Sequence, residues 1–131
     1  MLIDSSIINK IKAEAEHSPR RRMNFCLHED FSSNAQKMLN YFLPDTVVPI
    51  HRHQTKNETY IIISGKVEVI FTNDHKEVCN TFILNRENGV YGIDIPKGQW
   101  HTIKVKEPSL IFECSDGPYI PLLEDDILGS L

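Results

Sequence analysis

The sequence predicts an all-β protein, a barrel or sandwich of short strands that follows one short N-terminal α-helix. From about residue 37 onward the chain consists of short runs rich in Val, Ile, Phe and Tyr, and most of these runs are separated by Gly, Pro, Asn or Asp. No helical periodicity occurs between them, which excludes an α/β fold. The candidate strands are residues 37–43, 47–52, 58–64, 66–72, 78–84, 90–95, 100–106 and 109–114.

The first segment, residues 1–17, has the pattern of an amphipathic helix. Asp4 is a suitable N-cap, and Pro19 ends the helix. Its apolar face consists of Ile7, Ile8, Ile11 and Ala15. A face of this kind must pack on something, either the chain's own barrel or a partner subunit.

The 131 residues fit a single domain. After the helix we expect an arginine-containing lead-in over residues 18–36, a barrel over 37–117 and a C-terminal tail over 118–131. Ser64 and Gly65 predict a tight hairpin turn, and residues 72–75 predict another.

Composition excludes several classes of protein. The net charge of -4 argues against nucleic acid or an anionic membrane surface as the main partner. No stretch approaches the roughly 18 apolar residues that span a bilayer, and the N-terminus lacks the pattern of a signal peptide. The 3 cysteines are odd in number and have no CxxC spacing, so we expect reduced thiols in a cytoplasmic protein.

Two fragments carry ligand-type residues. His51 and His53 are two residues apart in a predicted strand, so they point to the same face, and Glu58 opens the next strand. Pro96 and Gly98 predict a tight turn into a strand that begins near His101. Closure of a barrel brings these side chains inside, where two His and one carboxylate can bind one face of a metal ion and leave other positions open.

These fragments resemble the two cupin motifs, HxH-x4-E-x6-G at His51, His53, Glu58 and Gly65 and PxGxxH from Pro96 to His101. The resemblance implies a single cupin, a double-stranded β-helix or jelly-roll barrel. It also implies that His51, His53, Glu58 and His101 bind one divalent metal ion. Zn, Ni, Fe, Mn and Co suit such ligands alike. The alternative is a cupin without metal that uses His and Glu for proton transfer, as metal-free sugar epimerases of this fold do.

The resemblance has departures. The glycines expected ahead of the first histidine and ahead of the proline are Asp45 and Val90, and the asparagine expected after the last histidine is Val105. These positions shape turns and packing, so they affect the alignment of the loops more than metal binding.

A closer resemblance extends over most of the chain. Ser18-Pro19-Arg20, Arg22, Asn24 and His28, then Gln36 to Asn40 and Pro49 to His53, resemble the WbuC family of cupin-fold metalloproteins. Members of that family occur in clusters for bacterial O-antigen and polysaccharide biosynthesis. The resemblance implies a surface-polysaccharide context and no particular reaction.

Further residues have both a functional and a structural interpretation. Arg20, Arg22 and Asn24 are either a solvated linker or a substrate-binding group at the barrel mouth, where a guanidinium binds a phosphate or carboxylate. Tyr60 shares strand parity with Glu58 and is either catalytic or a core tyrosine. His28 is a second catalytic candidate, with a surface position as its alternative.

The function follows only in outline, because one barrel fold serves many chemistries. The first hypothesis is a metal-dependent enzyme, an isomerase or epimerase or a lyase, that acts on a small oxygen-rich molecule such as a sugar or sugar nucleotide. An iron-dependent dioxygenase uses the same ligands, and a non-catalytic metabolite-binding or sensing cupin is a further alternative. The expected partners are a small-molecule ligand, with an anionic one as a candidate, and a second copy of the chain in a homodimer.

Overall fold

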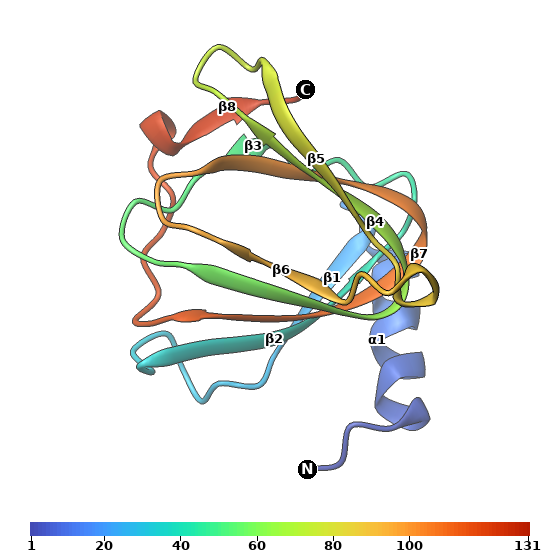
Figure 1. The fold of residues 1–131 in the computed structure, drawn as a ribbon. Coiled ribbons are helices and arrows are strands. Elements are labelled where there is room, and N and C mark those ends of the chain that lie inside the picture. Colours follow the sequence, from blue (N-terminus) through green and yellow to red (C-terminus); the bar gives the residue numbers. More distant parts are fainter.

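Strands of the computed structural model, which describes residues 1–131, form an 8-stranded antiparallel sheet that curves into a barrel with one helix outside it (Figure 1). The predicted fold class, an all-β barrel with a short N-terminal helix, is confirmed. The elements are α1 (Ser5–His17), β1 (Arg22–Cys26), β2 (Ala35–Phe42), β3 (Ile50–His51), β4 (Glu58–Thr72), β5 (Val78–Leu84), η1 (Arg86–Asn88), β6 (Gly92–Ile95), β7 (Trp100–Asp116), η2 (Glu124–Asp126) and β8 (Ile127–Gly129).

The helix packs on its own barrel. Asp4 caps α1 as predicted, because its side chain accepts hydrogen bonds from the backbone N–H groups of Ser6 and Ile7 at 3.1 and 3.2 Å. Ile11 and Ala15 on the predicted apolar face are fully buried. They pack in a cluster with side chains of β2, of β7 and of the residue that follows β2, namely Leu39, Tyr41, Leu110 and Leu43. The face therefore needs no partner subunit to cover it.

Two long strands, β4 and β7, pair along most of their length and form the frame of the barrel. The predicted hairpin at Ser64 and Gly65 is wrong, because β4 runs through these residues with a shift in register. Gly65 has φ +88, and a Cβ there would collide with the backbone of Pro108 and Ser109 on β7. The glycine thus marks a bulge where two strands approach closely, and not a reversal.

The ends of the chain add strands that the sequence pattern did not predict. β1 lies within residues 18–36 and pairs with β2, so the lead-in is part of the sheet. The predicted tail, residues 118–131, contains β8, which pairs with β3. The predicted segments 100–106 and 109–114 form one strand, β7. The turn at 72–75 and the strand at 78–84 are confirmed.

Apolar side chains fill one part of the barrel interior. This cluster includes Val67, Val69, Leu84, Ile103 and Val105, all of them nearly inaccessible to solvent. The remaining interior space is a pocket lined by residues of β1, β2, β4 and β7. No helix of the structure is long and apolar enough to cross a membrane.

We expect the chain to form a homodimer through the β5 edge. β5 pairs only with β4, so one of its edges has unpaired backbone groups. Val78, Phe82 and Ile83 on this strand are large apolar residues that remain exposed. Light scattering at micromolar concentration should give the mass of a dimer, and Ile83→Lys should give a monomer.

The control for this variant is Leu2→Lys, which changes another exposed apolar side chain far from β5 in the sequence. It should leave the mass unchanged. A wild-type monomer, or a dimer that survives Ile83→Lys and other charges on β5, would contradict the predicted interface.

Candidate metal centre

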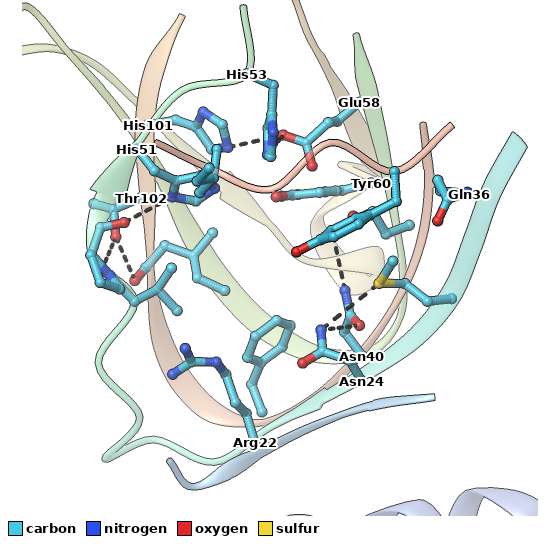
Figure 2. Close-up of a pocket in the computed structure, with 18 of the residues that line it drawn as sticks. Arg22, Asn24, Gln36, Asn40, His51, His53, Glu58, Tyr60, His101 and Thr102 are labelled. Atoms are coloured by element: carbon cyan, nitrogen blue, oxygen red, sulfur yellow. Dashed lines mark hydrogen bonds and ion pairs between the residues drawn. The ribbon is translucent and has the colours of Figure 1, made fainter. Parts of the chain in front are cut away.

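Register between strands places the ligand-type residues together. His51 on β3 is paired directly with His101 on β7, although the two are far apart in the sequence. His53 follows β3 by two residues, and Glu58 is the first residue of β4. The side chains of these four residues therefore meet at one end of the barrel interior (Figure 2).

The two loops that carry the motifs are bonded to each other. The predicted turn at Pro96 is present: the N–H of Gln99 donates to the Pro96 carbonyl at 3.2 Å, and Gly98 has φ +82. The Gly98 N–H donates to the carbonyl of His53 at 2.7 Å, and the Lys97 N–H donates to the Asn57 side chain at 2.8 Å. These bonds hold the start of β7 against the loop that follows β3.

Three of the four predicted ligands present donor atoms close to one another. One atom each from His51, His53 and Glu58 lies within 4.8 Å of the others, and such a group could hold a metal ion. Oε1 of Glu58 lies 3.3 Å from Nε2 of His53 and 3.2 Å from Nε2 of His101. Glu58 is 3% exposed and His101 is 1% exposed, so these two are nearly closed to bulk water, whereas His51 and His53 are partly exposed.

Backbone carbonyls orient two of the imidazoles. Nδ1 of His51 lies 2.8 Å from the Pro49 carbonyl, and Nδ1 of His101 lies 2.9 Å from the Gln99 carbonyl. A carbonyl oxygen only accepts, so each Nδ1 must carry the proton that it donates. The neutral ring then presents a lone pair at Nε2, as metal-binding histidines do when the second nitrogen is bonded to the protein.

The polar atoms of the centre lack a partner that a cation would supply. Oε1 of Glu58 and Nε2 of His101 are buried, and neither makes a hydrogen bond, although they are 3.2 Å apart. Two lone pairs repel at this distance, so the approach of these atoms is favourable only when a positive charge, a proton or a metal cation, lies between them. The imidazoles of His51 and His53 and the carboxylate of Glu58 fit a divalent transition metal ion, and the His101 imidazole lies beside them.

Electrostatics keeps the donor atoms in the form that binds metal. Burial, and next the charge of His101, lower the pKa of His51 from 6.5 to about 4. Burial also lowers the pKa of His53. Burial alone would raise the pKa of Glu58, but the neighbouring imidazoles outweigh it and bring the pKa down to about 2. At neutral pH, His51 and His53 are therefore neutral and Glu58 is ionised.

The pocket beside this centre has a volume of about 660 Å³, and every predicted site residue lines it. The Tyr60 hydroxyl points into the open space near the histidines, and Arg22 lies on the opposite side (Figure 2). Arg20, Asn24 and His28 line the wall that β1 and its flanking residues form. His28 accepts a hydrogen bond from the Lys37 N–H at its Nδ1, at 3.0 Å.

Sequence reasoning missed Glu113 and Asn40, which also line the pocket. Glu113 on β7 is paired with Tyr60 on β4 and with Met38 on β2. The Asn40 side-chain amide donates to Oε1 of Glu113 at 3.0 Å, and the Asn24 amide donates to the Asn40 side-chain oxygen at 2.7 Å. Strand alternation shows that one of Glu113 and its neighbour faces inward, but the register across the sheet decides which one does.

Two pocket groups hold their protons at neutral pH. Burial, and next the charge of Glu58, raise the pKa of Glu113 to about 8. Burial and then the charges of Glu58 and Glu113 raise the pKa of Tyr60 well above 10. The hydroxyl of Tyr60 and the carboxyl of Glu113 are therefore available as hydrogen-bond donors beside the ligand cluster.

Comparison with solved structures identifies the fold. A cupin superfamily protein from Desulfitobacterium hafniense is similar with a TM-score of 0.58 and 16% identity, over 72% of this chain and 76% of that one. The DMSP lyase DddQ from Ruegeria pomeroyi is similar with a TM-score of 0.62 and 18% identity, over 79% and 51%. CapF, a capsular polysaccharide assembling protein from Staphylococcus aureus, gives 0.59 and 18%, over 83% and 33%. These likenesses show a cupin fold.

The chain belongs to a family described as a domain of unknown function (DUF6016), whose match covers residues 3–84. The matched region is more than half of the chain and includes His51, His53 and Glu58, whereas His101 lies outside it. No curated protein sequence matches the chain.

Removal of one imidazole should remove the metal and leave the barrel intact. His53 lies after the end of β3 and packs in neither apolar cluster, so His53→Ala should retain the circular dichroism spectrum of the wild type. Loss of a residue that is hydrogen-bonded to a metal ligand lowers metal affinity by roughly 10- to 100-fold, and loss of the ligand His53 itself should lower it further. Mass spectrometry of metal content after incubation with Zn²⁺ or Ni²⁺ measures this, and His75→Ala, on the exposed turn, is the control. Equal metal in both variants would exclude the centre.

Metal should be retained at more acidic pH than free imidazoles allow. With ordinary histidine pKa values, occupancy should fall as the pH drops below about 6. Because the folded-state pKa of His51 lies near 4, a proton does not compete for its Nε2 until the pH approaches that value. Metal content after dialysis across pH 7 to 4 should therefore stay high at pH 6 and fall toward pH 4. Loss of half of the metal already above pH 6 would contradict the depressed pKa.

Proposed function

We propose that this protein is a divalent-metal-dependent cupin enzyme that acts in the bacterial cytoplasm on a small oxygen-rich metabolite, a sugar or sugar nucleotide. The observation that supports this most directly is the pair of buried ligand atoms without hydrogen bonds, Oε1 of Glu58 and Nε2 of His101, beside a pocket of about 660 Å³. A structural histidine or glutamate in a barrel core would have its polar atoms satisfied by the protein.

The pocket joins the ligand cluster to groups that can hold a proton. A bound divalent ion supplies Lewis-acid polarisation of a carbonyl or hydroxyl oxygen. Tyr60 contributes a protonated hydroxyl that can donate to a substrate oxygen, and Glu113 contributes a carboxyl group on the paired strand. Burial of Glu58 and His101 limits the access of water to their side chains. Isomerisation, epimerisation and lyase chemistry all use polarisation of this kind together with transfer of a proton.

The biological context is inferred from resemblance. Residues 18–53 resemble the WbuC family, whose members occur in clusters for O-antigen and polysaccharide biosynthesis. One structural neighbour is a capsular polysaccharide assembling protein, and another is a lyase. They make a surface-polysaccharide role and lyase chemistry candidates for this chain. Because both are under 25% identical to it, they do not identify a substrate.

Two alternatives use the same residues. An iron-dependent dioxygenase would use the His and carboxylate ligands with open positions for oxygen and substrate. A non-catalytic metabolite-binding or sensing cupin would use the pocket and the metal for affinity alone. A dioxygenase would show turnover that depends on iron and on oxygen. A binding or sensing cupin would bind its ligand without turnover.

The test is turnover of a panel of sugar nucleotides by protein loaded separately with Zn, Ni, Fe, Mn or Co. Product formation followed by NMR, with and without oxygen, distinguishes the three functions. Tyr60→Phe should lower kcat by about 100-fold, as does loss of one donor to a developing charge, with KM little changed. Ile61→Val, on the outward-facing neighbour of Tyr60, is the matched control. A chain with full metal content and no turnover of any sugar nucleotide would contradict the proposed enzyme.

A further inference from the structure

Three consecutive arginines precede or open β1, and only the middle one is neutralised. The Nε atom of Arg21 lies 3.0 Å from the carboxylate of Asp45. Arg20 and Arg22 line the pocket, and neither forms an ion pair. Of the two glutamates that line the pocket, Glu58 lies beside His53 and His101, and Glu113 holds its proton and accepts from Asn40. Two arginines that line the cavity therefore have no carboxylate partner.

The backbone at Arg21 separates the three side chains. Arg21 has φ 58, a left-handed conformation that is strained for a residue with a Cβ atom. Its side chain compensates, since Nη1 donates to the Glu16 carbonyl at 2.7 Å while Nε bonds Asp45. Strain of this kind persists only where surrounding contacts hold it. The result is that Arg21 bonds outside the pocket while Arg20 and Arg22 both line it.

Neutral acceptors hold the two pocket arginines in place. Nη1 of Arg22 donates to the Thr46 hydroxyl at 3.1 Å and to the Val47 carbonyl at 3.0 Å. Nη2 of Arg20 donates to the Asn24 side-chain oxygen at 3.2 Å. These bonds fix the direction of each guanidinium, do not reduce its charge, and leave other N–H groups free.

The charges of the two arginines oppose each other. Burial, and next the charge of Arg20, lower the pKa of Arg22. Like charges at the edge of one pocket repel each other, and an oxyanion that binds both guanidinium groups would relieve this repulsion. Figure 2 shows Arg22 on the far side of the pocket from His51, His53 and His101. A ligand that spans the pocket can therefore contact Arg22 at one end and the histidines at the other.

We propose that Arg20 and Arg22 form a subsite for the oxyanion of the ligand, a phosphate or carboxylate, while an uncharged oxygen of the same molecule meets the cluster of His51 and Glu58. Only the contact between the uncharged oxygen and the cluster of His51 and Glu58 rests on the proposed function. The planar guanidinium matches both anions by paired N–H···O bonds, so the shared chemistry is an oxyanion on a sugar-sized molecule. Asn24 is a positioning residue, because it orients Arg20 through the bond to its Nη2.

The experiment measures binding of glucose 1-phosphate, glucuronate and glucose by calorimetry, with metal-loaded protein and with protein treated with a chelator. Arg20→Gln and Arg22→Gln should each lower the affinity for the anionic sugars by roughly 10- to 100-fold and leave the affinity for glucose unchanged. Arg86→Gln removes the same charge from η1, outside the pocket, and should change nothing. Metal content and thermal unfolding of each variant show that the centre and the fold persist, and Arg20, which is exposed, is the safer substitution.

The outcomes separate the two proposals. Preference for glucose 1-phosphate, glucuronate or both over glucose, lost in the Arg20 and Arg22 variants, supports the subsite and tells phosphate from carboxylate. Arginine-dependent binding that persists in a protein without measurable metal affinity supports the subsite and overturns the proposed metal enzyme. Equal binding of glucose and the anionic sugars, or an Arg86→Gln effect as large as the others, would overturn the subsite.

Discussion

The pairing of β7 with its neighbours is the constraint on which both the barrel and the centre depend. β7 pairs with β2, with β3 and along most of its length with β4, so one strand sets the register of three others. Through these pairings His101 meets His51, and Glu113 meets Tyr60. A slip of one residue would turn every one of these side chains to the opposite face. The bulge at Gly65 lets β4 follow this strand as it bends, which keeps both ends of the pairing in register.

Polar groups without partners lie on both sides of the pocket. They lower the stability of the fold, and burial of apolar side chains elsewhere offsets this loss. Buried lone pairs of Glu58 and His101 face each other on one side, while Arg20 and Arg22 lack counter-ions on the other. Apolar clusters inside the barrel and beneath α1 supply the burial that stabilises the fold around them. Natural proteins violate local rules of polar satisfaction mainly where they bind or react, and this pocket combines two such violations of opposite charge.

Local signals in the sequence were reliable wherever a short segment determines its own structure. The cap at Asp4, the turn after Thr72 and the glycine turn before Trp100 depend on bonds between residues close in the chain. The hairpin expected at Gly65 failed because a glycine suits a turn and a bulge equally, and only the approach of Pro108 distinguishes them. β1 was not predicted because its alternating polar residues face a pocket and not a core, so its pattern is that of a loop.

The sequence by itself determined the strand-rich fold class, the amphipathic helix and the ligand-type residues, because strand parity and motif spacing are properties of neighbouring residues. It also placed Tyr60 on the face of Glu58 and identified Arg20, Arg22 and Asn24 as candidates. Only the tertiary structure decided that Glu113 and Asn40 complete the wall, that the last residues form β8, and that Arg21 is the arginine paired outside the pocket. These depend on register between strands distant in the chain, which follows from the closure of the whole barrel and not from any local pattern.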